Sequence, residues 1–136
     1  MNGKKYNVGY TTGVFDMFHI GHLNILRRAK EQCSKLIVGV STDELVRSYK
    51  QKVPVIPFEE RFAIVAACRY VDEVVSQEDR DKIAAFHRIG FDVWKGKPLF
   101  VDVERYLNEH GVEVVYFPYT QGTSSTILRE KILRER

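Results

Sequence analysis

Short apolar runs alternate with amphipathic segments from one end of the chain to the other. Runs rich in β-branched residues predict strands, and apolar positions three and four residues apart predict helices. The expected strands cover residues 6–11, 35–40, 71–75 and 112–117, with a fourth strand in chain order starting at 91–94. The expected helices cover residues 23–33, 58–69, 79–88, 101–110 and 125–134, with one more from Asp43, capped by Thr42.

This alternation predicts an α/β fold of the Rossmann-like kind, an open parallel five-stranded sheet with helices on both faces. The chain has 136 residues and no repeat, low-complexity tract or linker, so we expect a single domain over residues 1–136. Apolar residues make up 44% and charged residues 29%, as is usual for a soluble globular protein.

The formal net charge of +3 is too balanced to indicate a nucleic-acid partner. No apolar stretch approaches the roughly 18–20 residues of a membrane span, and the first residues lack the features of a signal peptide. We therefore expect a cytoplasmic protein with no membrane partner. Cys33 and Cys68 both fall on expected helices, which favours two buried thiols, although a single disulfide stays open.

The most informative segment is residues 13–22, Gly-Val-Phe-Asp-Met-Phe-His-Ile-Gly-His, which joins the first expected strand to the first expected helix. Open α/β sheets bind ligands at such turns, and the N–H groups of a helix N-terminus bind phosphate. Gly13 and Gly21 allow the backbone to approach a ligand closely. His19 and His22 could share one pocket and stabilise charge that develops on phosphorus. Asp16 could hold a turn or orient a histidine.

Each of these residues also has a structural interpretation when taken alone. A histidine near a helix start is usually a cap or a surface residue, and a lone aspartate is usually a turn residue. A metal site made of Asp16, His19 and His22 is a third interpretation, but no cysteine cluster or further nearby histidine completes it. Taken together, the residues favour phosphate binding, and no metal ligand is predicted.

The pattern G-x-F-D-x-x-H-x-G-H resembles the HxGH signature of the nucleotidyltransferases related to class I aminoacyl-tRNA synthetases. It is most similar to the cytidylyltransferases, and among them to the bacterial glycerol-3-phosphate type. The resemblance implies that His19 and His22 contact the nucleotide phosphates and stabilise the transition state. It also implies a nucleotide site lined by the residues Gly13, Val14, Phe15, Asp16 and Gly21. Val14 stands where these relatives often have threonine, so only a backbone contact remains there.

Three further motifs strengthen the resemblance. Residues 41–44, Ser-Thr-Asp-Glu, resemble the family's S-T-D-E, in which Asp43 helps to shape the nucleotide site; the alternative is a first-turn helix acid. Lys50 and Lys52 match a Lys-x-Lys that closes on the phosphates as catalytic residues, with Lys50 also binding substrate; the alternative is a solvated pair. Arg61 matches an E-x-R that binds phosphate or substrate; the alternative is an intrahelical pair with a glutamate.

A second phosphate-binding loop is expected near the C-terminus. Residues 119–126 resemble the family's R-T-x-G-I-S-T-T, which grips the β- and γ-phosphates. The implied contacts come from Thr120, Ser124, Ser125 and Thr126. Tyr119 replaces the family's arginine, and Arg129 could supply some of that charge. Ordinary N-capping by the serines is the alternative, and capping does not exclude phosphate binding.

The largest departure from the family lies between Val93 and Trp94. Relatives have a longer strand here that ends in a G-D-D-W-type motif near the nucleobase, and about half a dozen residues are absent by comparison with typical strand length. Either the polypeptide lacks them, which would cripple base recognition, or they exist and are unseen because they are disordered. The second explanation is favoured, because a four-residue strand would leave the sheet edge poorly finished.

The resemblance implies transfer of a cytidylyl group from CTP to a phosphorylated alcohol, glycerol 3-phosphate above all, giving a CDP-alcohol and pyrophosphate. Mg²⁺ would accompany the nucleotide, and residues 69–73 resemble a segment at the family's homodimer interface. Teichoic acid or capsule biosynthesis would fit such a product. Two alternatives stay open, namely an adenylyltransferase of the same superfamily and a catalytically impaired nucleotide-binding regulator.

Overall fold

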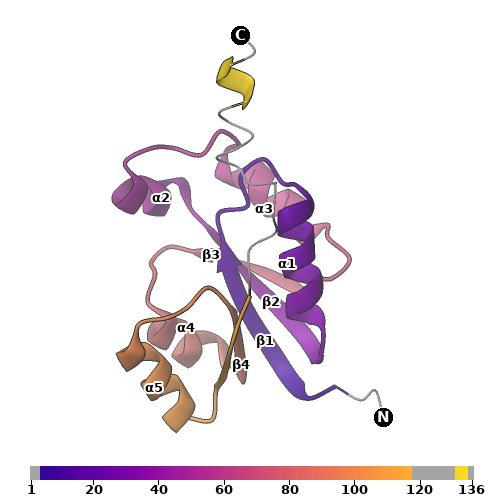
Figure 1. Cartoon of the computed structure of the whole chain (residues 1–136), viewed down its shortest axis with the longest axis vertical. Helices are drawn as coiled ribbons and strands as arrows, with labels where there is room; N and C mark the ends of the chain where they lie inside the picture. Colours follow the sequence, from indigo (N-terminus) through magenta and orange to yellow (C-terminus); the bar gives the residue numbers. More distant parts are fainter. Residues whose placement is uncertain (1–3, 118–130, 135–136) are drawn as a thin grey trace.

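The computed structural model describes residues 4–117 and 131–134 and confirms the predicted fold (Figure 1). In this part of the chain, five parallel strands form one sheet in the order β3-β2-β1-β4-β5. The strands are β1 (Tyr6–Gly13), β2 (Cys33–Ser41), β3 (Glu73–Gln77), β4 (Val93–Gly96) and β5 (Glu113–Tyr116). The helices of residues 4–117 are α1 (Ile20–Lys30), α2 (Asp43–Lys50), α3 (Phe58–Ala66), α4 (Lys82–Ile89) and α5 (Val101–Glu109). No helix of the described ranges is long and apolar enough to cross a membrane.

Two helical layers enclose the sheet, α1 and α3 on one face and α4 and α5 on the other (Figure 1). β2 supplies both cores, because successive side chains of a strand point to opposite faces. Leu36, Val38 and Val40 pack in the core that includes α1 and α3, whereas Ile37 packs in the core that includes α4 and α5. This explains why β2 reads as a continuous apolar run.

The boundaries of α1 differ from the prediction at both ends. The helix begins at Ile20 because His19 caps it, and it ends at Lys30, after which Gln32 adopts a left-handed φ of 66°. Cys33 therefore opens β2, so the expectation that both cysteines lie on helices is wrong. Cys33 is buried, whereas Cys68 lies half-buried beyond the end of α3, and both thiols are free.

The other elements keep their predicted type with shifted ends. α3 stops at Ala66, and β3 begins only at Glu73. α4 begins at Lys82 because the Asp81 carboxylate accepts the N–H groups of Ile83 and Ala84 as its N-cap. Of the last predicted helix, residues 131–134 are helical, and the remainder lies outside the described residues.

β4 corrects the favoured explanation of the shortened strand. The 136-residue polypeptide runs directly from Val93 to Trp94, so no unseen segment lies between them. The short strand is paired on both sides, at Gly9 and Tyr10 of β1 and along all of β5. Its four residues are all buried, so a strand of this length completes this part of the sheet.

Candidate functional site

The turn between β1 and α1 holds an unusual backbone. Phe15 has a φ of 56° and Met17 a φ of 50°, the left-handed conformation that residues other than glycine rarely adopt. Each such residue costs on the order of 1–3 kcal/mol unless surrounding contacts stabilise it. The buried Phe15 ring lies over Gly13, where an added Cβ would stand only 3.0 Å from the ring. A larger residue at this position would press on the Phe15 ring, which would have to shift by a few tenths of an ångström.

His19 and His22 are brought together as the sequence predicts. His19 caps α1, and its Nδ1 accepts the N–H of Gly21 at 3.0 Å, while Nδ1 of His22 accepts the N–H of His19 at 3.2 Å. The two rings stack with centroids 3.9 Å apart. Because each Nδ1 is an acceptor, the neutral tautomer carries its proton on Nε2. The start of α1 thus offers two Nε2–H donors, while His19 itself caps the first N–H groups of the helix.

Both imidazoles are held neutral by their surroundings. Burial lowers the pKa of His19, and it lowers the pKa of His22 from 6.5 to about 4, with the charge of His19 adding to this effect. The rings of Phe15 and Phe18 pack against His22, each with a centroid distance of 5.4 Å. At neutral pH the pair therefore acts through hydrogen-bond donation rather than through positive charge.

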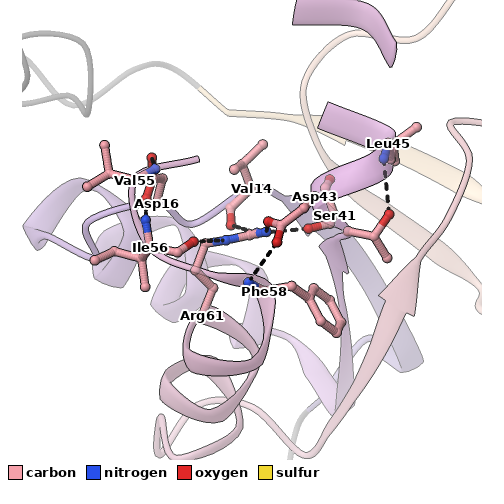
Figure 2. A network of polar contacts seen from close by, with 10 residues as sticks. Val14, Asp16, Ser41, Asp43, Leu45, Val55, Ile56, Phe58 and Arg61 are labelled. Atoms are coloured by element: carbon pink, nitrogen blue, oxygen red, sulfur yellow. Dashed lines mark hydrogen bonds and ion pairs between the residues drawn. The ribbon is translucent and has the colours of Figure 1, made fainter. Parts of the chain in front are cut away.

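Asp16 links the histidine turn to the loop that follows α2. Its two carboxylate oxygens accept the N–H groups of Val55 and Ile56 at 2.8 and 2.9 Å (Figure 2). The side chain is buried. A carboxylate that is removed from water needs such hydrogen bonds to offset the loss of hydration. Asp16 thus holds a turn of backbone, as one of its predicted roles had it, but that backbone belongs to a loop about 40 residues further along the chain.

The Arg61 guanidinium is buried, with about 1% of the residue exposed, and it meets four acceptors from different segments (Figure 2). Its Nε donates to the carbonyl of Ile56 at 2.8 Å, and one terminal nitrogen donates to the carbonyls of Val14 and Ser41 at 2.7 and 2.8 Å. The other terminal nitrogen pairs with Asp43 at 2.6 Å. The intrahelical pair with a glutamate is therefore wrong. Phosphate binding by Arg61 stays a prediction, and it would require the guanidinium to leave these partners.

Asp43 lies in the first turn of α2, whose cap Thr42 accepts the N–H of Leu45 at 3.1 Å, as predicted. One carboxylate oxygen of Asp43 pairs with Arg61, and the other accepts the N–H of Phe58 at the start of α3, at 3.4 Å. Asp43 therefore joins α2 to α3, in addition to its place as a first-turn acid.

Lys50 and Lys52 lie at the end of α2 and just after it, both exposed. Gln51 between them has a left-handed φ of 55°, which ends the helix. Only two residues separate Lys52 from Val55, which Asp16 holds. The loop that follows Lys50 and carries Lys52 is thus anchored to the histidine turn at its far end.

The predicted second phosphate loop, with Thr120, Ser124, Ser125 and Thr126, lies outside the described residues, as do Tyr119 and Arg129. Over the described ranges, no group of three or more His, Cys, Asp or Glu side chains is arranged to hold a metal ion. The oxygens of Asp16 and Asp43 already accept protein donors, so these carboxylates do not form a cage for Mg²⁺. Any Mg²⁺ that accompanies a nucleotide here would therefore be held mainly by the phosphates of that nucleotide.

Sequence reasoning missed the backbone partners of this site. The amides of Val55 and Ile56 and the carbonyls of Val14 and Ser41 bind the charged side chains, and a backbone group has no signature in the amino-acid sequence. The signal that could have found them is the presence of charged residues inside otherwise apolar segments, since buried charges need partners.

The family model described as cytidylyltransferase-like matches residues 10–131, which include this whole site. The chain belongs to the cytidylyltransferase-like family. It is 37% identical over 129 residues to the glycerol-3-phosphate cytidylyltransferase of Bacillus subtilis strain 168, covering 90% of this chain and 94% of that protein. It is 39% identical over 114 residues to the FAD synthase of Thermococcus kodakarensis, covering 79% of this chain and 76% of that one.

The crystal structure of a lipopolysaccharide core biosynthesis protein from Thermoplasma volcanium GSS1 has the same fold as this chain. The TM-score is 0.74, with 24% sequence identity over 85% of this chain and 99% of that one. At this identity the likeness shows the fold alone. Nucleotidyl transfer is the chemistry of the family, and the relatives' names differ in the molecules that they imply.

Proposed function

We propose that this protein is a cytidylyltransferase that transfers CMP from CTP to a phosphorylated alcohol, with glycerol 3-phosphate as the leading acceptor. The observation that carries the proposal is the stacked pair of His19 and His22 at the start of α1, with both Nδ1 atoms taken by backbone N–H groups. This arrangement leaves two Nε2–H donors at a helix N-terminus, where phosphate oxygens are stabilised. The match to the glycerol-3-phosphate enzyme along most of both chains supports the choice of acceptor.

In the proposed reaction an oxygen of the acceptor phosphate attacks the α-phosphorus of CTP in line. A bond forms between that oxygen and phosphorus, the bond from phosphorus to the α–β bridging oxygen breaks, and pyrophosphate leaves with the electron pair. The attacking phosphate is already anionic, so no strong general base is needed, and catalysis depends on positioning and charge stabilisation. His19 and His22 donate to the α-phosphate and the bridging oxygen, where negative charge develops. Mg²⁺ carried by the nucleotide phosphates would supply further neutralisation of their charge.

The remaining assignments follow the family resemblance. Lys50 and Lys52 approach the phosphates when their loop closes, which would also exclude water. The backbone of residues 13–16 and Gly21 lines the nucleotide. The residues expected to hold the triphosphate are Thr120, Ser124, Ser125 and Thr126, and they stay predictions, as do a homodimer through residues 69–73 and a cytoplasmic location.

The test is a screen of pyrophosphate release in which CTP and ATP are each paired with glycerol 3-phosphate, phosphoethanolamine, phosphocholine and flavin mononucleotide. We expect turnover with CTP and a phospho-alcohol, and the highest kcat/KM with glycerol 3-phosphate. Turnover with ATP alone would overturn the cytidylyl assignment. CTP binding by calorimetry without turnover in any pair would indicate a nucleotide-binding regulator instead.

An adenylyltransferase is the second candidate, and one observation favours it. The FAD synthase of Thermococcus kodakarensis is as similar to this chain as the glycerol-3-phosphate enzyme is, and FAD contains an adenylyl group. The resemblance also implies that the segment nearest the nucleobase is shortened at β4, which has four residues. The pair of ATP and flavin mononucleotide in the screen tests this candidate directly.

A further inference from the structure

The strained residue Phe15 is held between two anchored neighbours. On its N-terminal side, the carbonyl of Val14 accepts Arg61, and on its C-terminal side, the carboxylate of Asp16 accepts Val55 and Ile56. A left-handed non-glycine residue persists only where the surrounding structure imposes it. The anchors on both sides of Phe15 meet this requirement.

The two anchors meet at a single residue, Ile56. Its N–H donates to Asp16 and its carbonyl accepts Nε of Arg61, while Arg61 also reaches Val14 (Figure 2). The bonds thus form a closed circuit that runs from Val14 through Arg61, Ile56 and Asp16 and returns through Phe15. Such a circuit fixes the turn and the loop relative to each other, because neither can move without breaking two sets of bonds.

Arg61 has the geometry of a residue that holds this circuit and not of one that faces substrate. Its side chain is fully buried, and its charge is balanced by Asp43 at 2.6 Å. A planar guanidinium can serve four acceptors that lie in different directions, whereas a lysine ammonium is a point charge with three donors on a flexible stem. The shape of the head group therefore matters at this position, beyond its charge.

We propose that Arg61 is a positioning residue, which closes the Val14–Arg61–Ile56–Asp16 circuit and so fixes the turn that carries His19 and His22 to the loop that carries Lys52. The proposal deepens the proposed function and rests on it for its kinetic consequences. In this account Arg61 acts on the reaction through the histidines and the lysine loop, and it makes no contact with the substrate phosphates.

The test compares three variants of the full chain, Arg61→Lys, Arg61→Gln and Asp43→Asn, with Arg28→Lys as the matched control on the exposed side of α1. For each variant, kcat and KM are measured separately for CTP and for the acceptor. Native-state hydrogen exchange is measured at the amides of Val55 and Ile56, with the core amide of Val38 as an internal reference. These amides report on the circuit without any substrate.

We expect Arg61→Lys and Arg61→Gln to lower kcat by roughly 10- to 100-fold, since displacement of catalytic groups by about 1 Å has an effect of this size. Both KM values should stay within about threefold, and exchange at Val55 and Ile56 should rise at least about tenfold while Val38 is unchanged. Asp43→Asn should give the same pattern more weakly, and its effect should not add to that of Arg61→Gln, because both act on one network. Arg28→Lys should match the wild type.

Two results would overturn the proposal. Full activity of Arg61→Lys beside an inactive Arg61→Gln would show that charge alone matters, and a KM for CTP or acceptor raised at least tenfold with kcat unchanged would show a phosphate ligand. If Arg61→Gln does not fold, Arg61→Lys and Asp43→Asn decide by the same readouts. If the wild type turns over no nucleotide, the proposed function fails, but hydrogen exchange still tests the circuit. Unchanged exchange at the Val55 and Ile56 amides in Arg61→Lys would refute the circuit. Faster exchange at these two amides, with Val38 unchanged, would support it.

Discussion

The two sides of β1 are built differently. Toward β2 the strand is paired from Tyr6 to Gly13, whereas toward β4 it is paired only at Gly9 and Tyr10. Beyond the β2 side, the charged side chains of Asp16, Arg61 and Asp43 cross-link the loops at the strand ends through hydrogen bonds. The buried hydroxyls of Thr11, next to Gly96 of β4, and of Tyr10, over Gly39 of β2, have no hydrogen-bond partner within the part of the chain that is described.

This difference concerns the proposed nucleotide site, because only one of the two sides carries the histidines that are proposed to bind phosphate. The side assigned to phosphate has a strained turn, a stacked histidine pair and a closed network of bonds. The other side of β1 has a four-residue strand whose Trp94 is buried against Tyr10, with ring centroids 5.9 Å apart. A tryptophan in the core cannot also stack on a base, so the choice of nucleotide depends on other groups.

The largest effect is expected from Trp94→Ala on the β4 side. The ring is buried among aromatic neighbours, and its Nε1 donates to the carbonyl of Lys97 at 3.1 Å, so removing it should lower the free energy of unfolding by about 3–5 kcal/mol. Urea denaturation measures the loss, and Trp94→Phe should lose less. If the two sides are separate, native exchange at the Val55 amide should not change in Trp94→Phe. Faster exchange there would show that the sides are coupled through the sheet.

The next effect is expected from His22→Ala on the phosphate side. Loss of one preorganised donor to the transition state should lower kcat by roughly 100-fold or more, while the fold is kept. Pyrophosphate release and circular dichroism measure the two quantities. His87→Ala is the control, since His87 lies on α4 and bonds to Tyr106 on α5 instead. A His22→Ala enzyme with normal kcat would remove the histidine pair from the mechanism.

The smallest effect concerns pH. Because the pKa of His22 is about 4 in the folded protein and near 6.5 in an unfolded chain, the unfolded state binds more protons between these values. The contribution of this group to stability is therefore complete above pH 6.5 and is lost as the pH falls toward 4, by at most about 1.4 kcal/mol per pH unit. His22→Gln should flatten the dependence of the unfolding free energy on pH in this window, and His87→Gln should not. Equal slopes in both variants would contradict the neutral buried state of His22.

Much of the fold could be predicted from the sequence, because strands and helices differ in their apolar period. Thr42 as a cap and α2 starting at Asp43 follow from local chemistry, and both were found. The helix was expected from residue 23, whereas α1 begins at Ile20, because the cap formed by the His19 ring depends on the fold of the preceding turn. The sequence does not show that a four-residue β4 is sufficient. The burial of its four residues comes from neighbouring segments of the folded chain, so it cannot be read from the strand's own residues.

The sequence by itself determined the order of the elements, the place of the histidine turn at a strand-to-helix junction, and the family resemblance that comparison with known proteins confirmed. Only the tertiary structure decided the partners of the charged residues. Arg61 and Asp16 bind backbone carbonyls and amides of distant loops, and any residue type can supply such groups. Burial and neutralisation of His22 likewise come from packing between segments, so they exist only once the chain has folded.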